Sequence, residues 1–404
     1  MLRDTPVSEL MVTDVLTFTP GDNVNDAMRA LLRRDVDGAP VVDGGAIVGL
    51  LTTADLIVEE ARVHEVDLGA VAHNVGVLRR LVSPALLCAV VKADGYGHGA
   101  IAVSEAALDA GADWLGVALI EEAAVLRKAG VRAPILLLSQ PRPADLAAVV
   151  RYDLRVCVTT PECAEQLADE AAAQNRSVMV HMKVDTGMNR IGVRPEDASA
   201  LAATIAARDE LVLEGVFTHC AVADDVDDPF TGTQLDRFDA VLAQLGAVGV
   251  TPTLRHAANS ATSICHPRGR YDIVRVGIAI YGIAPAPGLA AELDLRPALS
   301  LRAEVSAVRR VRAGEGVSYG LRHRFDADTT VATVPIGYAD GVPRALGLTG
   351  GEVLIGGVRR AIVGVVTMDQ LMVDCGDDGV AVGDEVVLLG TQGAETITAD
   401  DWAE

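Results

Sequence analysis

Residues 89–99, AVVKADGYGHG, are the most informative stretch of this chain, because an apolar run leads there directly into a polar, glycine-rich turn. The run brings Lys92 to the point where a buried strand would end. Removing an ammonium group from water is costly, so a lysine held there is expected to use its amine. The plainer alternative is a core lysine whose amine reaches solvent; Tyr96, His98 and the neighbouring glycines favour the first interpretation. Since a neutral amine attacks aldehydes, the stretch predicts a covalent site for pyridoxal 5'-phosphate (PLP).

Composition limits the classes of protein to which the chain can belong. Its 404 residues predict two or three domains, and with half of them hydrophobic but only 3% aromatic, the core must consist mainly of Ala, Val and Leu. A net charge of −22 argues against nucleic-acid and anionic-membrane partners. The six cysteines lack CxxC spacing, and we find neither a signal peptide nor a membrane-spanning stretch. We therefore expect a cytoplasmic protein with reduced thiols.

Short apolar runs alternate with Ala-rich helical segments through the middle of the chain. This alternation indicates parallel strands, and eight such units are the number that closes a (β/α)8 barrel; a doubly wound open sheet is the competing architecture. The predicted helices include residues 121–129, 161–173, 198–207 and 234–248. The eight predicted strands are residues 86–91, 114–117, 135–138, 155–158, 178–184, 211–218, 253–256 and 273–276.

The pattern differs on either side of this region. After Pro297, short strands broken by glycines predict an all-β domain. The first 60 residues read as strand, helix, two strands and the start of a second helix, which predicts a small α+β unit. We therefore expect three domains, at residues 1–60, 61–295 and 296–404.

Polar residues follow the ends of five predicted barrel strands, where barrel active sites lie. A single histidine in such a place is more often structural, but five groups together predict a site. A metal centre of Cys265, His266 and His256 matches no usual zinc spacing, so we expect no metal. The strand-end residues are Lys92; Lys183, Asp185 and Arg190; His219; His256, Asn259 and Ser260; and Arg275, Gly277 and Ile278.

From residue 62 to residue 404 the sequence resembles the alanine racemases, PLP enzymes of fold type III built from a barrel and a β-domain. Eight motifs carry the resemblance, and they occur in the family's order over more than three quarters of the chain. They are VKADGYGHG, KVDTGMNRIG, THCAVAD, HAANSA, VRVGIAIYG, VSYG, PIGYADG and TMDQ.

The resemblance implies a role for each matching residue. Lys92 would bind PLP as a Schiff base and act as one catalytic base, and Tyr319 would be the opposite base, contributed across the interface of a homodimer. Arg190 and the backbone of Met368 would hold the substrate carboxylate. The remaining implied roles are Arg275 at the pyridine nitrogen, Ser260 with the Gly277 and Ile278 amides at the phosphate, Tyr96 assisting there, His219 near the ring, Lys183 as a carbamylated partner of Arg190, and Tyr338 at the substrate entrance.

These roles agree with the chemistry of the residues. Inverting a carbon requires a base on each of its two faces. An arginine stays protonated, so Arg275 leaves the pyridine nitrogen neutral, and a neutral nitrogen disfavours transamination. Fold-type III decarboxylases have an acidic residue at this position, so Arg275 also argues against a decarboxylase. The implied function is interconversion of L- and D-alanine to supply D-alanine for peptidoglycan. The alternatives are a racemase for serine or another small amino acid, and a catalytically impaired, nucleotide-responsive regulatory relative.

Two further features follow from resemblance. Residues 7–58, through GAPVVDGGAIVGLLTTADL, resemble one CBS module, with Thr52 and Asp55 at positions that touch the ribose or phosphate of an adenine nucleotide. The module would sense a nucleotide or aid dimerisation, and a plain αβ cap in which Thr and Asp cap a helix is the alternative. The family normally continues beyond TITADDWAE into a strand whose tyrosine grips the phosphate, so we expect a truncated β-domain with an unpaired edge.

Overall fold

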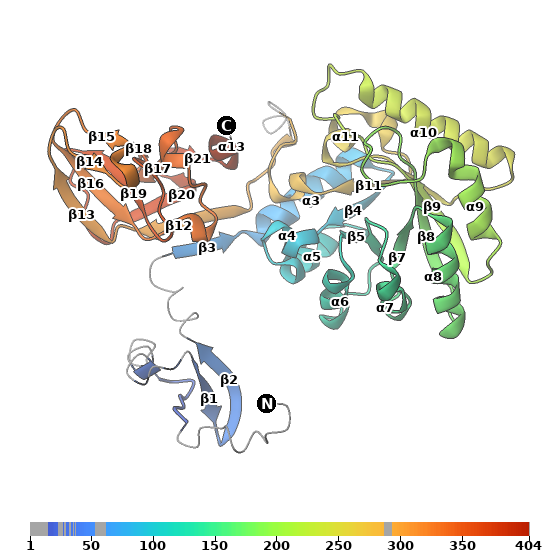
Figure 1. The fold of residues 1–404 in the computed structure, drawn as a ribbon, viewed down its shortest axis with the longest axis horizontal. Helices are drawn as coiled ribbons and strands as arrows, with labels where there is room; N and C mark the ends of the chain where they lie inside the picture. The colour runs from blue at the N-terminus through green and yellow to red at the C-terminus, as the bar shows by residue number, and fades with distance from the viewer. Residues whose placement is uncertain are drawn as a thin grey trace. The chain divides into compact units, whose positions relative to one another are not determined.

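The computed structural model describes residues 15–22, 27, 30–31, 34, 36, 38–52, 62–286 and 293–403. The chain divides into two compact units. One is residues 66–299, and the other combines residues 300–404 with the first 65 residues. Figure 1 shows the elements of each unit along the chain.

The first unit is a nearly closed barrel of eight parallel strands. Their order is β10-β9-β8-β7-β6-β5-β4-β11, and backbone hydrogen bonds from Asp272 to Arg255 and from Arg275 to Ala258, both 3.0 Å, join the two ends of this series. The barrel is therefore confirmed over the open sheet. The strands are β4 (Leu86–Val90), β5 (Trp114–Val117), β6 (Ile135–Leu137), β7 (Arg155–Val158), β8 (Val178–Lys183), β9 (Leu211–Phe217), β10 (Leu254–His256) and β11 (Ile273–Val276).

Helices surround these strands on the outside of the barrel (Figure 1). Helix α8 shows why they form where they do: Pro161 opens it, the Thr160 side chain caps it, and its buried residues recur every three or four positions. Helix α10 begins four residues before the predicted start, because the Asp228 carboxylate accepts from the Phe230 amide at 2.7 Å. The helices are α3 (Leu68–Val82), α4 (Lys92–Tyr96), α5 (Ala100–Asp109), α6 (Ile120–Lys128), α7 (Leu146–Arg151), α8 (Pro161–Ala173), α9 (Ala198–Ala206), α10 (Phe230–Ala247) and α11 (Ser260–Cys265).

The second unit is an all-β domain, as expected from its short glycine-broken strands. One sheet has the order β18-β17-β20-β12-β3 with β21 also paired to β20, a second has the order β13-β16-β19, and β14 pairs with β15. Its core consists mainly of Val, Ile and Leu side chains. The strands are β12 (Leu299–Glu304), β13 (Ala307–Val311), β14 (Gly316–Val317), β15 (His323–Arg324), β16 (Thr329–Val334), β17 (Glu352–Ile355), β18 (Val358–Ala361), β19 (Leu371–Gly376), β20 (Glu385–Gln392) and β21 (Glu395–Ile397), followed by α13 (Ala399–Ala403).

Strand β3 (Arg62–Val66) belongs to the sheet of the β-domain, where it lies beside β12. The predicted domain boundary at residue 61 gives these five residues to the barrel instead. The sequence pattern does not reveal this pairing, because the two strands are separated by more than 230 residues. The local sequence of a strand does not indicate which distant strand it pairs with. The barrel is therefore inserted between two neighbouring strands of one sheet.

The amino-terminal region contains a β-hairpin of β1 (Gly38–Asp43) and β2 (Ala46–Thr52). Gly44 and Gly45 connect the strands with φ of 56° and 85°, the left-handed conformation that a two-residue hairpin loop requires. Phe18, Leu31 and Ala39 are buried together in its small core. The predicted second helix, Asp55 and the side chain of Thr52 lie outside the described residues.

Among the described residues, no helix combines the length and the apolar character that crossing a membrane requires.

Candidate active site

A cavity of about 670 Å³ opens at the carboxyl ends of the barrel strands. Most of the strand-end residues predicted from the sequence border it, together with Phe217, which sequence reasoning missed. His256 is fully buried behind the cavity wall and is absent from its lining. The predicted residues that line the cavity are Lys92, Tyr96, Lys183, Arg190, His219, Asn259, Ser260, Arg275, Gly277 and Ile278.

Three other predicted site residues belong to the β-domain, and they gather on one part of it. Tyr319, Tyr338 and Met368 are 71%, 39% and 54% exposed. The Ala339 amide donates to the Met368 carbonyl at 3.0 Å, and the Ser318 hydroxyl donates to the Val365 carbonyl at 2.5 Å. Both tyrosine-bearing turns are thus attached to the same segment, residues 365–368.

The turn that begins at Lys92 is left-handed, which the sequence did not predict. Ala93, Asp94 and Tyr96 have φ of 52°, 52° and 55°, and Gly95 lies between them with φ of 63°. A left-handed conformation costs about 1–2 kcal/mol for each non-glycine residue. The surrounding structure must therefore hold this turn in place, and it is the turn that positions the lysine.

Glu122 is one of the residues that hold this turn in place. One carboxylate oxygen accepts from the Ala93 amide at 2.6 Å, and the other accepts from the amides of Ala118 and Leu119 at 2.8 and 3.0 Å. The turn is thereby tied to the start of α6. Sequence reasoning missed this role, although a glutamate at the third position of a helix is a known capping signal.

Hydroxyl and amide groups gather at one side of the cavity. The Ser260 hydroxyl accepts from the Gly277 amide at 3.0 Å, and Ile278 opens a short 3₁₀ helix, η5 (Ile278–Tyr281). A Cβ atom on Gly277 would lie 2.5 Å from the Tyr96 hydroxyl oxygen, so a larger residue there would displace the Tyr96 side chain. Such backbone amides and hydroxyls are the groups that bind a phosphate.

Arg275 is buried beside this group, and most of its donors are occupied. Its Nη1 donates to His256 Nδ1 at 2.8 Å, and its Nη2 donates to the carbonyls of Thr218 and Ala257 at 2.8 and 3.1 Å and lies 3.3 Å from His219 Nδ1. The side chain also borders the cavity. Burial lowers the pKa of Arg275 to about 10, so the guanidinium stays charged at neutral pH.

Two other titratable groups of the cavity are shifted toward their neutral forms. Burial, followed by the positive charges of Arg275 and Lys183, lowers the pKa of His219 to about 2. Burial is also the main cause that lowers the pKa of Lys183 to about 8. The ring of Phe217 lies beneath the two buried cations, with its centre 5.4 Å from Lys183 Nζ and 5.3 Å from Arg275 Cζ.

Arg190 lies on the loop that follows β8. Asp185 shapes this loop by accepting from the amides of Gly187 and Asn189 at 2.9 and 3.0 Å. Arg190 itself is exposed at the cavity and forms no ion pair within the described part of the chain. Its guanidinium is therefore available for a carboxylate ligand.

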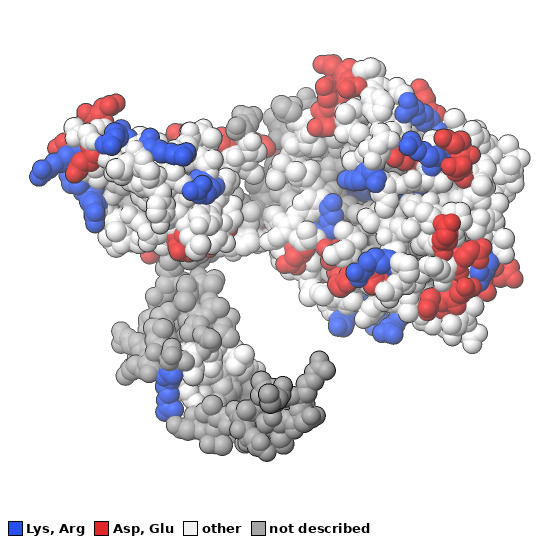
Figure 2. All heavy atoms as spheres, in the orientation of Figure 1, with Lys and Arg blue, Asp and Glu red and all other residues white. Residues whose placement is uncertain are grey.

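The residues considered for a metal centre are held in other ways. His256 is part of the hydrogen-bonded barrel interior, and His266 Nε2 lies 3.2 Å from the Ala223 carbonyl oxygen. No group of three or more His, Cys, Asp or Glu side chains in the described ranges is placed to hold a metal ion. On the face shown in Figure 2, acidic and basic side chains are interspersed, without a continuous basic surface.

Three family models match the chain: alanine racemase, N-terminal domain (residues 66–285), alanine racemase, C-terminal domain (residues 298–404) and CBS domain (residues 7–61). The alanine racemase of Symbiobacterium thermophilum is 49% identical over 84% of this chain and 90% of its own length. A crystal structure of the alanine racemase from a D-cycloserine-producing Streptomyces lavendulae aligns with a TM-score of 0.81 at 40% identity, covering 86% of this chain and 92% of that one. A histidine racemase from Leuconostoc mesenteroides subsp. sake aligns with a TM-score of 0.76 at 30% identity, covering 85% and 92%.

Proposed function

This chain belongs to the alanine racemase family, and from that premise we propose that it interconverts L- and D-alanine with PLP as its cofactor. The supporting observation is that Lys92, the buried cation Arg275 and the Ser260–Gly277 donors border one cavity. PLP is an aromatic aldehyde that carries a phosphate. A lysine suits its aldehyde, a buried arginine suits its ring nitrogen, and hydroxyl and amide groups suit its phosphate. When bound, PLP withdraws electrons from the substrate's α-carbon so that its proton can leave.

The chain's own residues would hold the cofactor in three places. Lys92 would bind it covalently through Nζ. Ser260 and the amides of Gly277 and Ile278, with Tyr96 beside them, would bind its phosphate. Arg275 would face its ring nitrogen; because an arginine keeps its proton, that nitrogen stays unprotonated, which favours racemisation over transamination.

Two side chains would move the substrate proton. Lys92 Nζ would serve one face of the α-carbon and the Tyr319 hydroxyl the other, since inversion needs a base on each side. Arg190 and the backbone of Met368 would hold the substrate carboxylate, which fixes the α-carbon between the bases. His219 would pack near the ring as a neutral imidazole, because its pKa of about 2 keeps it uncharged.

We propose further that the active enzyme is a homodimer in which Tyr319 comes from the partner subunit. The high exposure of Tyr319 and Met368 supports this arrangement, since both would be covered by a second copy. Mixing inactive Lys92→Ala and Tyr319→Phe chains tests it. In mixed dimers one site regains both bases, so about a quarter of wild-type activity should return; no recovery would exclude a shared site.

The cellular role follows from the product. We propose that the enzyme supplies D-alanine for peptidoglycan in the cytoplasm, where its six cysteines, all free thiols, would stay reduced. The similarity to a histidine racemase keeps racemisation of another amino acid as the second candidate. The CBS domain match supports binding of an adenine nucleotide, tested by titrating AMP and ATP into the same assay.

The decisive experiment uses the whole chain purified with PLP. We expect a visible imine absorbance band, a pyridoxyl adduct on Lys92 after borohydride reduction and peptide mapping, and formation of D-alanine from L-alanine. Lys92→Ala should show none of these, whereas Lys128→Ala, a change at an exposed lysine of the barrel, should behave as wild type. A colourless, inactive wild-type protein would overturn the proposal and favour the regulatory alternative.

A further inference from the structure

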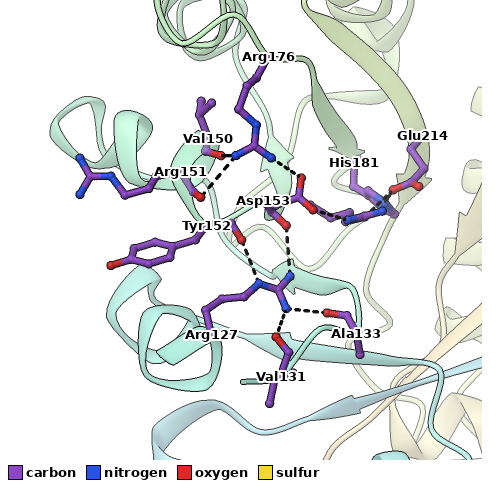
Figure 3. Close-up of polar contacts among 11 residues, drawn as sticks. Arg127, Val131, Ala133, Val150, Arg151, Tyr152, Asp153, Arg176, His181 and Glu214 are labelled. Atoms are coloured by element: carbon purple, nitrogen blue, oxygen red, sulfur yellow. Dashed lines mark hydrogen bonds and ion pairs between the residues drawn. The ribbon is translucent and has the colours of Figure 1, made fainter. Parts of the chain in front are cut away.

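A chain of buried polar side chains leads from Arg275 away from the cavity through the barrel interior. Arg275 Nη1 lies 2.8 Å from His256 Nδ1, His256 Nε2 lies 2.8 Å from His181 Nδ1, and His181 Nε2 lies 3.0 Å from Glu214 Oε2. Both histidines are fully buried. Figure 3 shows His181 and Glu214 pointing toward one another.

The chemistry of the first member sets the direction of every hydrogen bond in this chain. An arginine can only donate, so Nδ1 of His256 must be an acceptor. Burial lowers the pKa of His256 and of His181, so each ring is neutral and carries one N–H. His256 therefore donates from Nε2 to His181 Nδ1, and His181 donates from Nε2 to the Glu214 carboxylate.

Glu214 is fixed as an anion at the far end. Burial raises its pKa, but the hydrogen bond from His181 and the charge of Arg155 outweigh this effect and leave the pKa below its usual value. Arg155 Nε lies 3.5 Å from Glu214 Oε2, and Arg155 Nη1 lies 3.8 Å from Asp153. Asp153 also pairs with Arg176 at 3.2 Å (Figure 3). The Glu214 carboxylate is thus held in the middle of β9, outside the cavity lining.

Arg275 itself has no carboxylate partner within the described residues. Its neighbours are two backbone carbonyls and two neutral imidazoles. An unpaired buried charge is strongly destabilising, and a hydrogen-bond chain that ends in an anion polarises each of its members toward that anion. The chain through His256 and His181 connects Arg275 to the Glu214 carboxylate by three hydrogen bonds.

We propose that Glu214 is the counter-charge of Arg275, and that His181 and Glu214 are positioning residues that orient its guanidinium toward the ring nitrogen of the cofactor. This inference rests on the proposed function, because it concerns the residue assigned to that nitrogen. The competing explanation is that the four side chains only fill the barrel interior. The two explanations differ in whether the charge and the direction of the bonds matter.

The first test removes the charge and keeps the shape. In Glu214→Gln the side chain can still accept from His181 but is neutral. With PLP labelled with ¹⁵N in its ring, we expect the ¹⁵N chemical shift of the bound cofactor to move and kcat to fall by about ten-fold, as when a residue that supports a metal ligand is lost. Glu210→Gln is the matched control: Glu210 lies just before the same strand and pairs with Arg208 at 3.3 Å, and its loss should change neither quantity.

The second test separates direction from packing. A glutamine at position 181 can accept from His256 with its oxygen and donate to Glu214 with its nitrogen, whereas leucine can do neither. His181→Gln should therefore retain the ring-nitrogen signal and most of the activity, while His181→Leu should resemble Glu214→Gln. A packing role would make both substitutions at 181 equally harmful and would leave Glu214→Gln harmless.

The outcomes distinguish this inference from the proposed function. A wild-type signal in Glu214→Gln would overturn the inference while wild-type racemisation stands. Failure of the wild-type chain to bind PLP or racemise alanine would overturn the proposed function instead. Thermal melts identify any variant that does not fold. Glu214 has 18% of its side chain exposed and His181 has none, so a substitution at Glu214 is less disruptive to folding.

Discussion

The barrel and the β-domain hold their site residues in opposite ways. In the barrel, Lys92, Ser260 and Arg275 are fixed by hydrogen bonds or by a constrained turn around one cavity. In the β-domain, Tyr319 and Met368 are more than half exposed. The barrel half of the proposed site is therefore built in advance within one chain, whereas the β-domain half is an exposed surface that the proposed partner subunit would cover. Cofactor binding should depend on the first half and turnover on both.

Tyr319→Phe is the strongest test of this difference. Losing one of two bases should lower kcat by about 10²–10⁴, while PLP uptake and the absorbance band should be unchanged because the barrel is intact. Steady-state racemisation and PLP titration measure the two quantities. Tyr152→Phe, at a barrel residue outside the cavity lining, serves as the control. Loss of PLP binding in Tyr319→Phe would contradict the division.

The buried histidines of the barrel predict a steep loss of stability in acid. The pKa values of His181, His219 and His256 are below 6.5 in the folded state. As the pH falls below 6.5 the unfolded chain takes up protons that the folded chain does not, so the free energy of unfolding decreases. The slope approaches about 1.4 kcal/mol per pH unit for each histidine that stays unprotonated in the folded chain, or about 3 for His219 and His256 together, and the lowered pKa of His181 adds to it.

Denaturation followed by the fluorescence of Trp114, a buried barrel residue, measures this slope between about pH 6 and pH 5. His219→Asn should reduce it by about 1.4 kcal/mol per pH unit, because one proton uptake is removed. A slope corresponding to fewer than one proton would show that the histidines are charged in the folded barrel.

Glu122→Ala tests how the barrel holds its lysine. Three backbone amides lose their acceptor, which should cost about 1–3 kcal/mol of stability. The left-handed turn at Lys92 should also relax, so PLP affinity should fall. Glu121→Ala is the control, since the neighbouring glutamate is exposed and has only a 3.9 Å pair with Arg142. Equal effects at both positions would show that Glu122 has no special role.

Gly277→Ala is expected to have the smallest effect. The added Cβ would meet the Tyr96 hydroxyl at 2.5 Å and displace that flexible side chain. PLP affinity should drop about five-fold, equivalent to about 1 kcal/mol, as measured by equilibrium titration. Gly232→Ala, in α10 with no atom within 4 Å of the new Cβ, should keep the affinity and slightly raise stability. An unchanged affinity in Gly277→Ala would remove Tyr96 from the proposed phosphate site.

The sequence predicted the barrel well because its parallel strands read as short, mostly apolar runs that alternate with helical segments. All eight predicted segments are strands, with bounds that differ by at most one residue at each end. In the β-domain the sequence predicted short strands but not the bounds of each one, because glycine-broken strands of two to eight residues carry a weaker signal. The pairing of β3 across the barrel also has no local signature.

The candidate site was predictable to the extent that its residues follow strands. Residues such as Lys183 and His219 reach the cavity simply because their strands end there. Phe217 and Glu122 were missed because a phenylalanine at a strand end and a glutamate in a helix's first turn are both ordinary. His181 and Glu214 lie inside strands, where only the closed barrel brings them together. The roles of the predicted site residues stay predictions until the experiments above are done.

The insertion of the barrel between β3 and β12 also bears on synthesis. Strand β3 leaves the ribosome early, yet its partner appears only after residues 67–298 have been made. A nascent chain folds its completed domains as they emerge. The barrel can therefore fold before β12 has been made, and until then β3 has no partner strand. The β-domain, which carries the second proposed base, can therefore assemble only late in translation.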